Sequence, residues 1–210
     1  MSLRDSCRRR LTWLVGPVAM VLMLAGHPLG AQAASGAYSD GTYGSCTYNS
    51  CGITLSSSGT LSLNVVPAGG TTCSVASDSV AVTTDSSTGY SLTMNDQATS
   101  SSLVGTSTGI ATDSGTPSAP SSLTANSWGW RVDGLSGFGA GPTTGSSNGG
   151  VPPVRFAGVP TSSQSAATVA TSSSAADPTV TTPVWYGLCV NTSIPADTYS
   201  STVVYTAVVN

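Results

Sequence analysis

Lysine and glutamate are absent from this 210-residue chain, and its only histidine, His27, lies near the N-terminus. The remainder therefore lacks most general acids and bases, and a serine nucleophile there would have no histidine or lysine to activate it. Aspartate pairs can hydrolyse glycosides, so an aspartate-dependent glycan hydrolase is the catalytic alternative that the composition leaves open. The sequence otherwise predicts a protein that is not an enzyme.

Positive charge is equally scarce. Beyond residue 33 the chain has two arginines, Arg131 and Arg155, against eight aspartates, which gives a formal charge of −6. Proteins bind nucleic acid by placing lysine and arginine against phosphates, and this surface would repel them. The composition therefore excludes nucleic acid as a partner.

The first 33 residues have the order of a secretory signal peptide. Four arginines precede residue 11, residues 11–24 are almost entirely apolar, and Ala31-Gln32-Ala33 offers a cleavage site. We expect residues 1–33 to be removed, which leaves an extracellular or cell-surface chain without a membrane span. The alternative is that this segment is kept as a membrane anchor.

After residue 34 the sequence indicates strands rather than helices. No long stretch has a 3.6-residue period, and glycine, proline or clusters of serine and threonine interrupt each apolar run. Alternating apolar and polar residues predict strands instead, at 55–66, 75–83, 90–94, 128–132, 154–156, 168–171, 184–190 and 202–209. The last of these has apolar or β-branched residues on both faces, so we expect it at the centre of a sheet.

This pattern predicts an all-β protein with a single antiparallel β-sandwich, either immunoglobulin-like or jelly-roll-like. Residues 34–52 form an N-terminal arm with a small cysteine loop, and residues 53–210 form the sandwich domain. Residues 100–122 and 134–153 are expected to be long loops, where binding surfaces are often built.

Four cysteines lie beyond the leader: Cys46, Cys51, Cys73 and Cys189. An even number in an exported chain favours disulfides, with three pairings open. We favour Cys46–Cys51, which closes a local loop, and Cys73–Cys189, which ties an early strand to a late one. A zinc site would need closer cysteine spacing or histidine ligands. The sequence predicts no metal and no cofactor.

The aromatic residues divide into two groups. Tryptophan on a strand most often fills a core, so Trp128 and Trp130 are expected to be packing residues. Aromatic residues in loops are better candidates for contact with a ligand. These candidates are Tyr43, Tyr48 and Phe138.

Two segments resemble a known family. Residues 87–93 (STGYSLT) and residues 194–207 (IPADTYSSTVVYTA) are similar to strands of WxL-type cell-wall-binding domains. Where that family has Trp-x-Leu, this chain has Tyr205-Thr206-Ala207. The whole pattern after the leader resembles the secreted, Ser/Thr-rich β-sandwich surface proteins of ultrasmall candidate-phyla bacteria. The resemblance implies a β-sandwich located at the cell surface.

Together these observations predict a secreted or cell-surface structural or adhesion protein, held non-covalently on the cell envelope. Its expected partner is cell-wall glycan or a surface protein of the same or another cell. One alternative is a self-assembling, pilin-like or surface-layer subunit, in which the β-branched C-terminal strand complements the sheet edge of a second copy of the chain. The other alternative is a carbohydrate-binding module or the glycan hydrolase named above.

Overall fold

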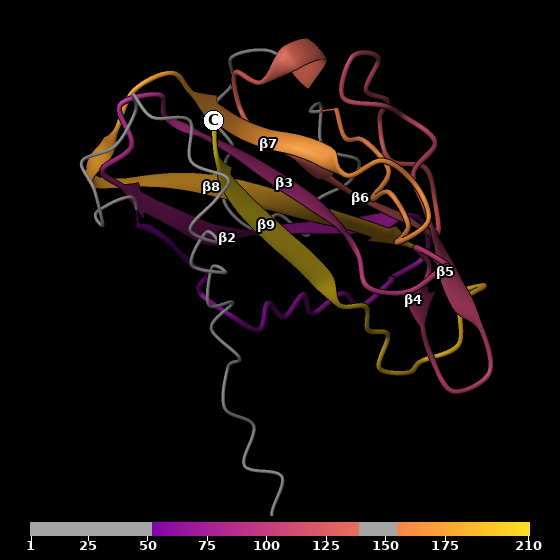
Figure 1. Cartoon of the computed structure of the whole chain (residues 1–210). Helices are drawn as coiled ribbons and strands as arrows, with labels where there is room; N and C mark the ends of the chain where they lie inside the picture. The colour runs from indigo at the N-terminus through magenta and orange to yellow at the C-terminus, as the bar shows by residue number, and fades with distance from the viewer. Residues whose placement is uncertain (1–51, 139–154) are drawn as a thin grey trace, which may run out of the picture.

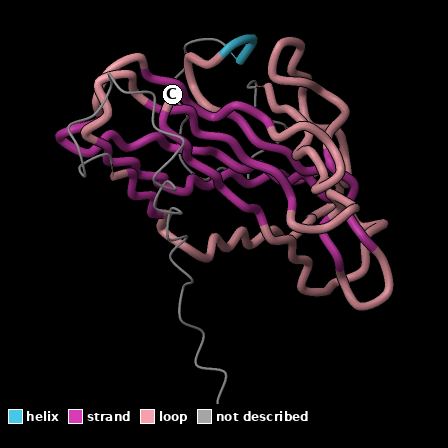
Figure 2. Tube along the Cα trace, viewed as in Figure 1, coloured by secondary structure: helices cyan, strands magenta, loops and turns pink. Residues whose placement is uncertain are grey.

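The computed structural model describes residues 52–138 and 155–210 (Figure 1). The regular secondary structure of these residues is nearly all β, with a single three-residue 3-10 helix among them, and loops connect the strands (Figure 2). The elements are β1 (Ile53–Ser56), β2 (Thr72–Thr84), β3 (Tyr90–Asp96), β4 (Leu103–Val104), β5 (Gly109–Thr112), β6 (Ser127–Arg131), η1 (Ser136–Phe138), β7 (Ala167–Ser172), β8 (Ala176–Val190) and β9 (Val203–Val209). Within these ranges we find no helix with the length and apolarity needed to cross a membrane.

The larger sheet has six strands in the order β1-β2-β8-β6-β5-β4. Its backbone is the long antiparallel pair β2–β8, which extends from Thr72↔Val190 to Thr84↔Ala176 with one irregularity near its end. All its other strand pairs are antiparallel except β5–β6, which is parallel. The strand predictions at 75–83 and 184–190 are confirmed, and both strands extend beyond the predicted bounds.

The smaller sheet has three antiparallel strands in the order β7-β3-β9. The central strand, β3, alternates as predicted, and Tyr90, Leu92 and Met94 are all buried. The turn before β3 ends at Gly89, whose φ of 82° favours glycine. A Cβ atom at this position would lie 2.1 Å from the carbonyl oxygen of Ser172 on β7. The turn therefore requires glycine at position 89, because another residue would be strained at this φ and its Cβ atom would collide with β7.

The two sheets share one hydrophobic core. In Figure 1 the strands β7, β3 and β9 lie across β2 and β8. Apolar residues from both sheets fill the space between them, including Val82, Leu92, Trp130 and Val184. The indole ring of Trp130 packs against Phe138 at a centroid distance of 5.2 Å, and Trp128 stacks with Tyr186 at 6.3 Å. The prediction that both tryptophans fill the core is confirmed.

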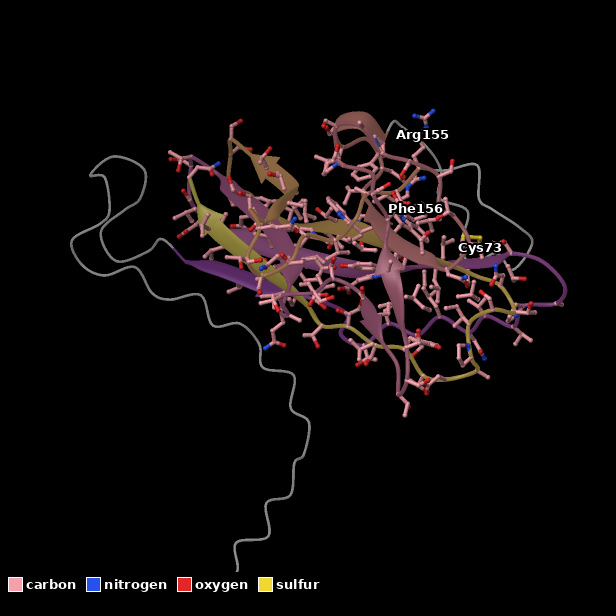
Figure 3. The ribbon with its side chains drawn as sticks, turned by 90° about the vertical axis from the view of Figure 1, so that its right-hand side faces the viewer. Cys73, Arg155 and Phe156 are labelled. Carbon is pink, nitrogen blue, oxygen red and sulfur yellow. A yellow bond between two sulfur atoms is a disulfide. The ribbon has the colours of Figure 1, made fainter. Side chains whose placement is uncertain are left out.

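A second, smaller core covers the other face of the six-stranded sheet. It consists of Cys73, Val75, Leu123, Phe156 and Cys189, all buried. In Figure 3 the neighbouring Arg155 points away from the ribbon, whereas Phe156 packs with the cluster that contains Cys73. This core fixes the loops on both sides of β6 against the sheet.

The predicted disulfide between Cys73 and Cys189 is confirmed. The two residues are direct partners in the β2–β8 register, with Cα atoms 4.1 Å apart and a sequence separation of 116. Closing a loop of this length restricts the unfolded chain, which in chain-entropy models contributes about 4–5 kcal/mol at most. The bond therefore stabilises the sheet at the end where the second core lies.

Three predictions about strands are wrong in part. Of the strand predicted at 55–66, only the beginning is paired, as part of β1, although Leu61, Leu63 and Val65 still pack against the main core. Apolar and polar residues alternate at 61–65 because one side of this extended segment packs on the core, although the segment is not paired with a strand. The described part of the strand predicted at 154–156 contains only an isolated bridge at Phe156, followed by another at Ala157. The predicted loop at 100–122 contains β4 and β5.

The position of β9 is the most informative difference between the predicted and the observed fold. The strand forms as predicted, but it lies at the edge of the three-stranded sheet rather than at its centre. Its apolar outer face, which led to the expectation of a central place, is exposed to solvent at Val204 and Val208. Among the described residues, this two-sided strand therefore has a paired strand, β3, on one edge only.

Candidate functional site

Several acidic side chains in the described ranges hold loops in place through hydrogen bonds. No group of three or more histidine, cysteine, aspartate or glutamate residues gathers there as a metal site would require. Asp96 is 1% exposed, accepts a hydrogen bond from the backbone N–H of Ala98 at 2.8 Å and accepts a second one from the hydroxyl of Ser201. The first is the turn bond expected for aspartate, and the second ties β3 to the segment before β9.

Asp113 and Asp197 have similar roles. Asp113 accepts from the backbone N–H of Gly115 at 2.7 Å and from the hydroxyl of Ser121. Asp197 accepts from the backbone N–H groups of Thr106 and Thr198, and these bonds hold the pKa of its carboxyl below the usual value. A general acid in glycoside hydrolysis needs a raised pKa, so Asp197 has the opposite electrostatic setting.

A hollow of about 560 Å³ opens beside Asp113, between the loop after β5 and the loop before β7. Its lining residues include several serines and threonines and Gln164, although the exposed surface of the hollow is more apolar than polar, and no lining residue is aromatic. Gln164 accepts a hydrogen bond from the backbone N–H of Thr161 at 2.8 Å, which closes its loop. The hollow can therefore hold a small polar group by hydrogen bonds, without stacking.

The free edge of β9 is the more distinctive surface. Its residues alternate: Val203, Tyr205 and Ala207 pack against the main core, whereas Val204 and Val208 are 38% and 52% exposed. Val209 is 41% exposed. The strand pairs with β3 along its whole length, from Val203↔Asp96 to Val209↔Tyr90, without a register shift. Within the described ranges its other edge has no partner strand.

Hydrogen bonds hold β9 at both ends. Before the strand, the backbone N–H of Gln97 donates to the carbonyl of Thr202 at 2.8 Å. After the strand, the side-chain amide of Asn210 donates to the carbonyl of Ser172 at 2.8 Å, and its oxygen accepts from the hydroxyl of Ser91 at 2.7 Å. The edge is therefore presented by a strand fixed to both of the other strands in its sheet.

A third attachment joins β9 to the larger sheet. The hydroxyl of Tyr205 hydrogen-bonds the hydroxyl of Tyr186 on β8 at 2.7 Å, inside the core. Burial raises the pKa of both phenols above the usual value, and the charge of Asp78 acts in the same direction. Both tyrosines therefore stay protonated at neutral pH, and this bond links the two sheets through uncharged groups.

Arg131 is the buried cation of the described residues. Its side chain is 1% exposed, forms an ion pair with Asp133 and lies opposite Trp185 in the β6–β8 register. Removal from water lowers the pKa of its guanidinium. The carboxylate of Asp133 therefore balances the buried positive charge at the end of β6.

The predicted site residues have different outcomes. Tyr43, Tyr48, Cys46 and Cys51 lie outside the described residues, so the contact and disulfide predictions for them stay predictions. Phe138 was expected to be an exposed contact, and this is wrong: it is 7% exposed and packs on Trp130. The 3-10 turn η1 directs its ring into the core, despite the glycine-rich sequence around it.

No residue of β9 was among the predicted site residues, although the self-assembly alternative named this C-terminal strand as one that could pair with a neighbouring copy. The available signal was the uncharged segment at 203–209, with apolar residues on both faces and no proline. No family model matches this chain, and neither a curated protein nor a solved structure matches it. The function is therefore inferred from the physical features of the chain itself.

Proposed function

We propose that this protein is exported and acts at or near the cell surface as a structural or adhesion protein, without catalysis. The observation that carries the proposal is the exposed, regular and uncharged edge of β9, with Val204 and Val208 facing solvent. An unprotected edge strand of this kind favours association with another surface or chain. No feature of the described residues supports a reaction centre as strongly as the β9 edge supports association.

The leader at 1–33 and the disulfide support export. Disulfides persist outside the reducing cytoplasm, and Cys73–Cys189 bridges two paired strands. The outer surface is rich in serine and threonine hydroxyls and poor in charge, as in the surface proteins that the sequence resembles. We assign the two packed sheets to the β-sandwich class, immunoglobulin-like or jelly-roll-like.

The proposed partner is cell-wall glycan or a surface protein of the same or another cell, held by non-covalent contacts. The test is co-sedimentation of the oxidised chain, residues 34–210, with isolated cell-wall sacculi and with intact cells of the producing organism. Recovery in the pellet with either supports envelope association. Recovery of all the protein in the supernatant with both, and in the culture medium in vivo, contradicts it.

A second candidate function, carbohydrate binding, is favoured by the hollow beside Asp113. Its hydroxyl and amide lining suits a glycan that is bound by hydrogen bonds. Replacing the lining residue Ser165 by tryptophan should fill the hollow and reduce binding to sacculi, whereas the same change at exposed Ser62 should not. Equal binding by both variants would contradict this second function and leave the first one intact.

A further inference from the structure

The described strands leave four sheet edges, and three of them are short or irregular. β1 and β4 end the six-stranded sheet and have four and two residues. β7 has six residues, and its pairing with β3 shifts register at Leu92 and Thr93. β9 has seven residues and no register shift. Short strands and bulges protect sheet edges from pairing, so β9 alone among these edges lacks both protections.

Charge does not protect this edge either. β9 contains no charged residue and no proline, although the chain carries a formal charge of −6 after the leader. Copies of a protein with this charge repel each other at a distance, and they could approach most easily where carboxylates are missing. The adjacent edge strand β1 lies beside β9 and presents polar Thr54 and Ser56 outward. Of these two neighbouring edge strands, only β9 presents exposed valines.

The sequence of β9 is nearly symmetric about Thr206. It reads Val-Val-Tyr-Thr-Ala-Val-Val from residue 203 to residue 209. If two copies pair antiparallel about this centre, Val204 of each faces Val208 of the other on the outer face. On the inner face, each tyrosine at 205 faces a small alanine at 207. Cross-strand pairs of β-branched residues stabilise a sheet, and the two-fold arrangement repeats each contact twice.

We propose that β9 pairs antiparallel with β9 of a second copy, about a two-fold axis at Thr206. The two three-stranded sheets then form one six-stranded sheet in the order β7-β3-β9-β9-β3-β7. This inference rests on the proposed function, because it takes the β9 edge as the binding surface, and it names a second copy of the chain as the partner. Main-chain hydrogen bonds supply the affinity, and the valine pairs set the register.

The first test is sedimentation velocity of the oxidised chain, residues 34–210, over a range of concentrations. We expect a reversible dimer. Val204→Lys with Val208→Lys places lysine opposite lysine at both outer positions, and should weaken the dimer about tenfold or more. Val204→Asp with Val208→Lys places opposite charges together in the same register and should restore it. Val180→Lys, at a 42% exposed valine on β8, is the matched control and should leave the dimer unchanged.

The second test examines the two-fold axis directly. A cysteine introduced by Thr206→Cys faces its own copy and should form an interchain disulfide under mild oxidation. Val204→Cys faces Val208 and should not crosslink in this way. Equal crosslinking of the two variants contradicts the register. Open-ended polymers instead of a dimer would also overturn the proposal, because they require a contact between different edges.

A persistent monomer overturns the proposal. The result can be separated from the test of the proposed function. A monomer that still sediments with sacculi or cells leaves envelope association standing and removes the two-fold partner. A dimer that sediments with neither supports the pairing and contradicts envelope association.

Discussion

Gly187, three residues before the end of β8, provides a sharp test of the second core. A Cβ atom placed there would lie 2.6 Å from Cζ of Phe156 and 2.8 Å from a methyl group of Leu123. Carbon atoms pack at about 3.5–4.0 Å, so a methyl group at this position must displace the buried phenyl ring. Forcing an extra methyl group into a packed core costs about 1–3 kcal/mol. We expect Gly187→Ala to destabilise the protein by this amount.

Urea unfolding of the oxidised protein, followed by tryptophan fluorescence, measures the effect. A loss of about 2 kcal/mol corresponds to a midpoint about 1 M lower when the urea dependence is about 2 kcal/mol per M. Gly70→Ala is the control, because a Cβ atom there meets nothing within 4 Å. We expect this variant to remain within about 0.5 kcal/mol of the parent protein.

A double variant makes the reasoning refutable. Phe156→Leu alone should destabilise by creating space in the core. Combined with Gly187→Ala, the smaller side chain should accommodate the added methyl group, so the two losses should not add. A coupling free energy of about 1 kcal/mol or more supports direct contact. Strict additivity would mean that Phe156 does not pack on Gly187, and the description of the second core would be wrong.

Three further predictions concern β9 and the disulfide. Tyr205→Phe removes the bond to Tyr186 and should cost about 1–2 kcal/mol in urea unfolding. Burial raises the pKa of both phenols, so the unfolded state ionises first above pH of about 10. Stability should therefore fall as pH rises through that value, more steeply in the parent than in Tyr205→Phe; equal slopes would contradict this. Replacing Cys73 and Cys189 by alanine should lower the free energy of unfolding by at most about 4–5 kcal/mol. Dithiothreitol should cause no such loss in this variant, because the Cys73–Cys189 bond that it would reduce is already missing. Asn210→Ala removes bonds to the ends of β3 and β7, and should speed hydrogen exchange in β9 while that in β2 is unchanged.

Local periodicity was sufficient to predict several elements. β3 alternates with a period of two, and Tyr90, Leu92 and Met94 all face the core. The Cys73–Cys189 pair was preferred from cysteine number and spacing along the chain, and it proves to join register partners. The first prediction succeeds because it depends only on which way each side chain faces, and the second because an even number of cysteines favours pairing between them.

Neighbour relations were not predictable in the same way. The pattern of β9 defines two faces but does not specify which strand lies on each side, so the strand was wrongly expected at the centre. Phe138 was wrongly expected to be exposed, because its burial depends on a contact with distant Trp130. The second core was missed, although a glycine inside an apolar strand, as at Gly187, often marks a close approach of another segment.

The disulfide also determines how the molecule would carry a mechanical load. A pull applied at residues 52 and 210 would pass from β2 to β8 through Cys73–Cys189, so the chain between the two cysteines would not be under tension. β9 lies outside this covalent shortcut, but it is hydrogen-bonded to β3, which lies inside it. Force would therefore peel β9 from β3 before it could separate β2 from β8. An extracellular assembly formed through β9 would yield at that strand, and the covalently closed body of each subunit would remain folded.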